Sequence, residues 1–73
     1  MPEIQPGSKF VIKRTKKTEG AYALSCYIQF ADGSIEDVHD NAGPISYEQA
    51  GDGGRECAQV KGYWGPYLDW QDR

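Results

Sequence analysis

The chain has 73 residues, with 8 Lys and Arg against 11 Asp and Glu, which gives a formal net charge of −3 at pH 7. A chain of this length buries only one thin hydrophobic core, which favours a binding surface over a cleft walled by two subdomains. Its acidic balance argues against nonspecific binding to nucleic acid. We therefore expect a single domain over residues 1–73, and a binding protein rather than an enzyme.

The cysteine content restricts the choice of metal sites and compartments. Cys26 and Cys57 are the only cysteines, and the chain has one histidine. Two cysteines at this separation match no zinc-binding spacing. We recognise no signal peptide and no apolar run long enough to span a bilayer. We expect reduced thiols in a cytoplasm and no metal or cofactor, while pairing of the two cysteines stays open.

The N-terminal part predicts an arm and a strand. Prolines and a glycine in residues 1–7 predict an extended arm. Residues 8–16 predict a first strand, with Phe10 and Ile12 on one face. Lysine and arginine along a strand protect a sheet edge against chance pairing, so we expect this strand at an edge.

The strongest pattern lies in residues 22–30, where every even position carries a large or apolar side chain. This period of two predicts a strand with one buried face. Asp32-Gly33 then supplies the positive φ angles of a two-residue type I′ turn. In the return strand, a β-bulge near residues 36–37 is needed to bring Val38 back to the core.

The C-terminal half gives weaker signals. Residues 39–44 have the composition of a loop, and the glycines in residues 48–54 predict that any helix ends quickly. Residues 55–61 predict a strand, with a helix there as the competing interpretation, and Pro66 predicts a short helical turn over residues 66–71. The fold is therefore mainly β, α+β at most: a small antiparallel sheet of three to four strands with a short C-terminal helix or 3-10 turn.

Charge is segregated along the chain. Residues 1–17 contain five basic residues and one acid, whereas residues 18–54 contain seven acids and no Lys or Arg. The basic strand could contact phosphates or an acidic protein surface, and the acidic loops could meet a basic surface. The competing interpretation is that these charges pair with each other and keep the domain in solution.

Catalytic patterns are weak. Asp37, His39 and Asp40 lie close in sequence, but acid–base or metal chemistry needs partners that converge from separate elements. The glycine-rich residues 51–54 lack the Lys and Ser/Thr of a phosphate-binding loop. A small metal-dependent enzyme that uses His39 is the alternative of a different class.

One segment carries a family resemblance. It is a Pro-flanked arm that leads into a basic strand, Pro6-Gly7-Ser8-Lys9-Phe10-Val11-Ile12-Lys13-Arg14. Together with its small size and acidity, the chain resembles the small phage-encoded RNA-polymerase-binding antiterminators, such as that of a Xanthomonas phage. The resemblance implies stoichiometric binding to host bacterial RNA polymerase, which inhibits initiation and promotes antitermination in the cytoplasm of an infected bacterium. We then expect a monomer, with no membrane and no direct sequence-specific nucleic-acid contact.

The predicted contact surface combines the basic strand with C-terminal aromatic residues, because Trp, Tyr and Arg dominate interface hot spots. Its residues are Lys9, Val11, Lys13, Arg14, Lys16, Tyr63, Trp64 and Tyr67. We also expect Trp64 or Trp70 to close the thin core. Two other functions stay open: an anti-CRISPR-like inhibitor whose acidic loops mimic nucleic acid, and a small structural or interaction domain of unknown partner.

Overall fold

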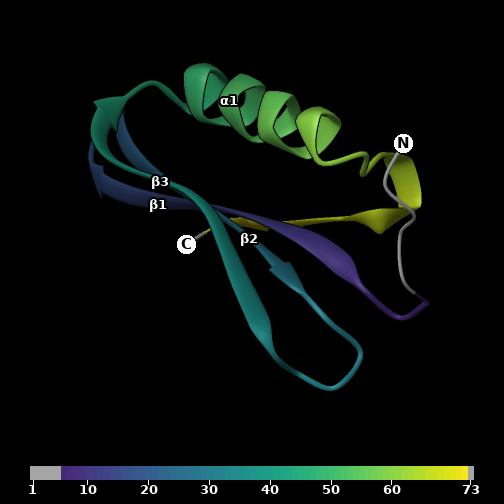
Figure 1. Cartoon of the computed structure of the whole chain (residues 1–73). Coiled ribbons are helices and arrows are strands. Elements are labelled where there is room, and N and C mark those ends of the chain that lie inside the picture. The colour runs from purple at the N-terminus through teal and green to yellow at the C-terminus, as the bar shows by residue number, and fades with distance from the viewer. Residues whose placement is uncertain (1–5, 73) are drawn as a thin grey trace.

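The computed structural model describes residues 6–72, so most of the expected arm, residues 1–7, lies outside the described residues. One four-stranded sheet has the strand order β3-β2-β1-β4, and a helix covers one of its faces (Figure 1). The elements are β1 (Lys9–Thr18), β2 (Ala21–Gln29), β3 (Ile35–Ile45), α1 (Tyr47–Val60), the 3-10 turn η1 (Gly65–Tyr67) and β4 (Leu68–Asp72).

The mainly β prediction is confirmed, but the sheet is mixed rather than antiparallel. β1, β2 and β3 pair antiparallel, whereas β4 pairs parallel with β1. The reason is the connection: α1 crosses the sheet between β3 and β4, and such a crossover returns the chain in the direction of β1. The expected edge position of the basic strand is therefore wrong, because β1 lies between β2 and β4.

The prediction that a helix ends quickly within residues 48–54 is wrong, and so is the strand expected over residues 55–61, since α1 (Tyr47–Val60) runs through both. The competing helical interpretation of residues 55–61 is the one that the structure confirms. Ser46 begins this helix with a capping box. Its Oγ accepts a hydrogen bond from the Gln49 N–H at 3.0 Å, and Gln49 Oε1 accepts one from the Ser46 N–H at 2.9 Å. This reciprocal cap satisfies two backbone donors at the helix start.

The glycines of α1 allow close packing instead of ending the helix. Gly51 and Gly54 are buried against the sheet. A Cβ atom at Gly54 would collide with the Ile12 side chain, and one at Gly51 would lie 3.1 Å from Arg14 Nη1. The helix thus rests on β1 at a distance that only small residues permit.

The central hairpin follows the predicted alternation, with Leu24, Cys26 and Ile28 buried. The two-residue turn is wrong, because Gln29 rather than Phe30 pairs with Ile35. Phe30 pairs instead with Ser34 through its N–H, at 2.9 Å, and the loop is one residue longer than expected.

The predicted bulge is confirmed. Asp37 lies opposite Tyr27 and His39 lies opposite Cys26, so Val38 is the extra residue between them. Val38 packs partly buried against the core. The bulge therefore has the effect expected of it, although it lies one residue beyond the predicted position.

The expected loop over residues 39–44 is wrong, since β3 continues to Ile45. A second register shift lies between Tyr22 and Leu24 of β2, which pair with Ile45 and Asn41 of β3. Residues 42–44 of β3 therefore bulge out of the regular pairing. Asn41 Oδ1 accepts a hydrogen bond from the Gly43 N–H at 2.9 Å, and Gly43 has a φ of 77°. Turn-forming residues are tolerated here because β3 is an edge strand with bulges.

The core lies between α1 and the sheet. It contains Phe10, Ile12, Leu24, Cys26, Ile28, Ala50, Ala58 and Tyr63. Trp70 packs partly buried against it, whereas Trp64 is 50% exposed. Of the two tryptophans, Trp70 thus takes the core role expected for one of them. The 3-10 turn predicted near the C-terminus is confirmed at η1, but its expected extent over residues 66–71 is wrong, because the chain enters β4 at Leu68.

Gly54→Ala tests the close approach of α1. We expect it to lower the free energy of unfolding by about 1–3 kcal/mol, because overpacking against Ile12 outweighs the roughly 1 kcal/mol that alanine gains over glycine in helix propensity. Urea unfolding followed by circular dichroism measures the change. The matched control is Gly53→Ala, whose Cβ meets only the Leu24 side-chain end at 3.1 Å and which should cost clearly less. Equal effects of the two variants would contradict this packing.

Candidate functional site

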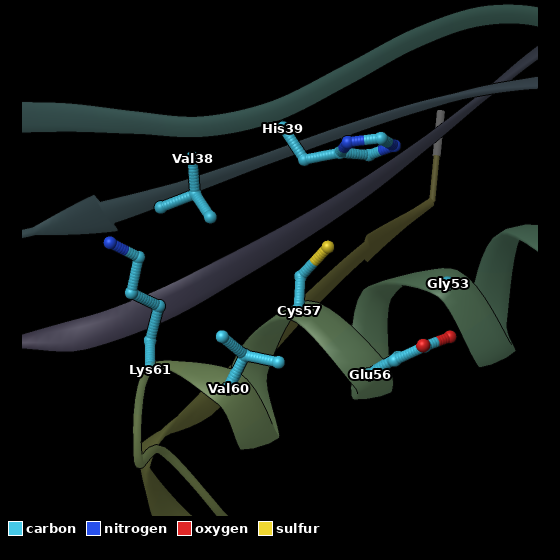
Figure 2. Close-up of a pocket in the computed structure, with 7 residues that line it drawn as sticks. All are labelled: Val38, His39, Gly53, Glu56, Cys57, Val60 and Lys61. Carbon is cyan, nitrogen blue, oxygen red and sulfur yellow. The ribbon is translucent and has the colours of Figure 1, made fainter.

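A groove lies between the bulged part of β3 and the C-terminal half of α1 (Figure 2). Its volume is about 480 Å³. The lining residues are Val38 and His39 of β3 and Gly53, Glu56, Cys57, Val60 and Lys61 at the helix. We call this feature the β3–α1 groove. It forms because the bulge directs both Val38 and His39 toward the helix, as Figure 2 shows.

The groove combines an apolar interior with polar groups. Val38, Cys57 and Val60 contribute apolar atoms, and the Val60 side chain is unusually open, with 77% of the residue exposed. His39 and Glu56 contribute polar groups, and both are exposed. Such a lining suits an apolar side chain with charged neighbours.

The alternative of a small metal-dependent enzyme would need ligands gathered around His39. Asp37 and Asp40 lie opposite Tyr27 and Ser25, whereas His39 lies opposite Cys26. Asp37, His39 and Asp40 nevertheless border one shallow hollow on β3, together with Ser25 of β2. Among residues 6–72, no group of three or more His, Cys, Asp and Glu side chains is placed to hold a metal ion.

Cys26 and Cys57 are free thiols that meet between β2 and α1. Cys26 is buried, and Cys57 is half-buried in the wall of the groove. Burial, together with the adjacent Cys57 thiol that shares a hydrogen bond with it, raises the pKa of the Cys26 thiol from 9.0 to about 12. At neutral pH the buried thiol is therefore protonated and a poor nucleophile.

A second candidate surface is the pair of aromatic rings on η1, which we call the aromatic turn (Trp64 and Tyr67). Their ring centroids are 6.0 Å apart in an edge-to-face arrangement, and the residues are 50% and 38% exposed. The Tyr67 N–H donates a hydrogen bond to the Trp64 carbonyl at 3.0 Å, and Pro66 lies within the turn. The backbone of the turn thus places the two rings against each other on the surface.

Three of the predicted contact residues lie inside the molecule. Val11 has no exposed surface, and Tyr63 and Arg14 are 6% and 8% exposed. The Tyr63 ring packs against Phe10 with centroids 5.7 Å apart. These side chains contribute to the fold, because a thin sheet uses its large residues for packing.

The predicted basic surface is partly neutralised by neighbouring acids. Lys9 pairs with Asp69 at 3.2 Å, and Lys16 pairs with Glu19 at 3.1 Å. Lys13 is half-buried. Asp69, the partner of Lys9, lies in β4 two residues after Tyr67 of the aromatic turn.

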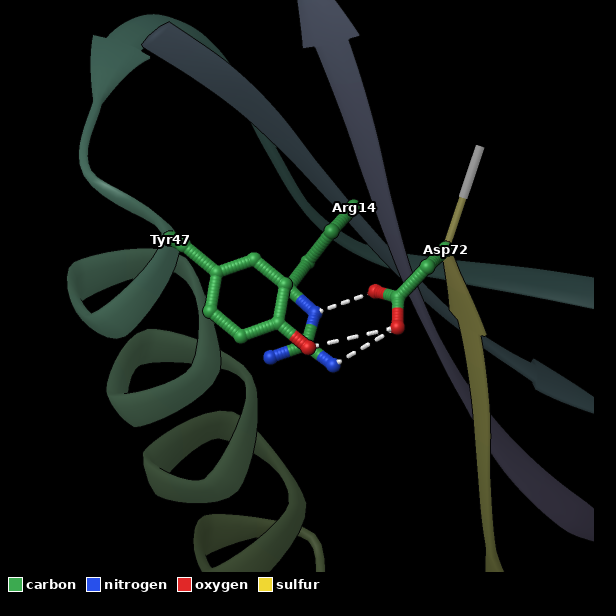
Figure 3. Close-up of polar contacts among 3 residues, drawn as sticks. All are labelled: Arg14, Tyr47 and Asp72. Carbon is green, nitrogen blue, oxygen red and sulfur yellow. Dashed lines mark hydrogen bonds and ion pairs between the residues drawn. The ribbon is translucent and has the colours of Figure 1, made fainter. Parts of the chain in front are cut away.

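Arg14 occupies the junction of three elements (Figure 3). Its Nε and Nη2 donate to the two carboxylate oxygens of Asp72 at 2.6 and 3.1 Å. Its guanidinium carbon lies 3.9 Å from the Tyr47 ring centroid and 4.8 Å from that of Trp70. The Tyr47 hydroxyl also donates to Asp72, at 3.3 Å. Arg14 therefore joins β1, β4 and α1, and we call this set of contacts the Arg14 clamp.

Comparisons of the chain with protein-family models, with curated proteins and with solved structures find no match. Within residues 6–72, no helix has the length and apolar character needed to cross a membrane. The functional conclusion therefore rests on the two surfaces described above and on the resemblance of the N-terminal segment.

The raised pKa of Cys26 makes stability depend on pH in the alkaline range. Because the folded pKa is about 12 and the ordinary value is 9.0, the unfolded chain loses this proton first as the pH rises. We expect this contribution to be fully present below pH 9 and to be lost progressively toward pH 12. Urea unfolding under reducing conditions gives the free energy of unfolding at each pH in this range. The contribution of Cys26 is the difference between the wild type and Cys26→Ala in the slope of this free energy against pH.

The matched control for this pH dependence is Cys57→Ala, which leaves the buried thiol in place. Burial is the largest cause of the shift, so this control should keep most of the wild-type slope. Identical slopes for the wild type and Cys26→Ala would contradict the burial of an uncharged thiol at this position.

Proposed function

We propose that this protein is a non-catalytic regulator that binds host bacterial RNA polymerase, inhibits initiation and promotes antitermination. The observation that supports binding is the aromatic turn, where two large rings are exposed and held rigidly against each other. Rigid, solvent-exposed Trp and Tyr side chains supply contact area at low entropic cost. The choice of RNA polymerase as partner rests on the resemblance of the N-terminal segment to phage antiterminators.

The size of the molecule is compatible with a standard interface. A specific interface buries roughly 800 Å² on each partner, and the whole chain exposes 4732 Å². The aromatic turn would form the apolar centre of such a patch, with the ion pair of Lys9 and Asp69 at its polar border. Binding through one such patch suits a stoichiometric regulator that needs no cofactor.

The alternative of an acidic inhibitor that mimics nucleic acid has its own observation. Glu36, Asp37 and Asp40 are exposed along β3. This alternative requires that the carboxylates of β3 carry the activity, whereas the polymerase proposal requires the aromatic turn. Variants that neutralise the β3 carboxylates but keep the aromatic turn therefore distinguish the two functions. They should abolish activity of a nucleic-acid mimic and leave polymerase binding intact.

Trp64→Ala and Tyr67→Ala test the polymerase proposal. The tagged wild-type chain should retain the β and β′ subunits from a proteobacterial lysate through moderate salt, at a stoichiometric ratio. Each substitution should weaken binding by about 2 kcal/mol or more, because both rings occupy the centre of the patch. Affinity capture with mass spectrometry, followed by titration of purified polymerase and a terminator read-through assay, measures the effect.

The matched control for the aromatic turn is Gln59→Ala, which truncates an exposed side chain outside both the turn and the β3–α1 groove and should leave polymerase binding unchanged. Circular dichroism should show that all three variants remain folded. Failure of the wild type to retain polymerase, or undiminished capture by both aromatic variants, would overturn the proposal.

A further inference from the structure

β3 is an open edge of the sheet. Among residues 6–72, β2 is the one strand that pairs with β3, and α1 covers the sheet mainly over β1 and β2. In Figure 1 the outer side of β3 faces away from the other strands. An edge strand presents unpaired backbone N–H and C=O groups to which an extended segment can add as a further strand.

The β3–α1 groove lies directly beside this edge. Side chains of an added strand would alternate between the two faces of the sheet. Those on the helix-covered face would meet Val38 of β3 and Val60 and Cys57 of α1, which line the groove. Backbone pairing and an apolar pocket therefore lie within reach of the same short segment.

Charge selects the occupant of this site. Glu36, Asp37 and Asp40 of β3 are exposed, and Glu56 is an exposed acid in the groove lining. Lys61 is the single cation among the lining residues. A second copy of the chain would place like carboxylates opposite one another, which is destabilising across paired strands. The basic strand of a second copy is not available, because β1 is interior.

We propose that β3 and the β3–α1 groove bind an extended, basic segment of a partner protein, which adds to the sheet beside β3. Apolar side chains of this segment enter the groove. Its lysine or arginine side chains pair with the carboxylates of β3. This site shares no residue with the aromatic turn, so it is a second interaction surface and does not depend on the function proposed above.

The probe is a fluorescein-labelled peptide of seven residues in which lysine alternates with valine. We expect it to bind the full chain, with shifts of backbone amide signals confined to β3 and to the second half of α1 in two-dimensional NMR spectra. A peptide with glutamate in place of lysine should bind at least about tenfold more weakly. A peptide with every backbone amide N-methylated should also lose about tenfold, because it cannot donate strand hydrogen bonds.

Two pairs of variants locate the site. Val60→Lys should weaken binding of the lysine–valine peptide by about tenfold, whereas Gln59→Lys, an exposed neighbour outside the groove, adds the same charge and should change it less than about twofold. Both positions are exposed, so both variants should fold.

The second pair removes carboxylates. The double variant Asp37→Asn/Asp40→Asn should weaken binding of the same peptide by about tenfold, because its lysines lose their partners. The double variant Glu48→Gln/Asp52→Asn removes the same charge from exposed positions outside the groove and should leave affinity within about twofold.

Several outcomes would overturn the proposal. One is the absence of binding of the lysine–valine peptide at a concentration of about 1 mM. Another is equal affinity for this peptide and its N-methylated form, which would indicate attraction between charges without strand pairing. A concentration-dependent dimer in sedimentation experiments, abolished by Val60→Lys, would assign the groove to a second copy instead. Because Trp64→Ala leaves the groove intact, it should bind the peptide normally, which separates failure here from failure of the polymerase proposal.

Discussion

The arrangement of the molecule depends on how a single buried arginine is satisfied. An arginine side chain that leaves water must regain its hydrogen bonds, and a bidentate carboxylate is its most effective partner. Arg14 finds this partner in Asp72 at the far end of the chain, with Tyr47 and Trp70 against its guanidinium group. The Arg14 clamp thus stabilises the parallel pairing of β4 with β1 and fixes the start of α1 over the sheet.

This constraint decides which parts of the chain remain available for partners. The basic first strand is enclosed between β2 and β4, so its charges serve mainly internal pairing. Large exposed apolar side chains are left at the aromatic turn, at Val60 in the β3–α1 groove, at Ile35 at the start of β3 and at Tyr47, whose ring lies in the Arg14 clamp. Binding is therefore expected at the end of the sheet near η1 and along the edge of β3, and both surfaces present preformed geometry.

Local patterns in the sequence predicted the features that local forces determine. The alternation in β2, the bulge before His39 and the turn at Pro66 follow from periodicity and turn chemistry. A helix was predicted only as the competing interpretation of residues 55–61, and the full length of α1 was not, because its glycines indicate a loop unless the sheet beneath them is known. The Ser46–Gln49 capping box was the available signal. β4 and the groove could not be predicted, since Asp72 acquires its role only as the partner of Arg14. The groove joins β3 to a helix whose glycines conceal it in the sequence.

Above all, the structure makes β1 an interior strand and β3 an open edge of the sheet. Amide hydrogen exchange of the free protein tests this arrangement most directly, when NMR resolves it residue by residue. If β1 is interior, every amide from Phe10 to Arg14 should exchange slowly, because both sides of the strand are paired. Alternate amides of β3 should exchange rapidly, because one side faces solvent. Rapid exchange at alternate amides of β1, together with uniform protection along β3, would contradict both the Arg14 clamp and the open edge.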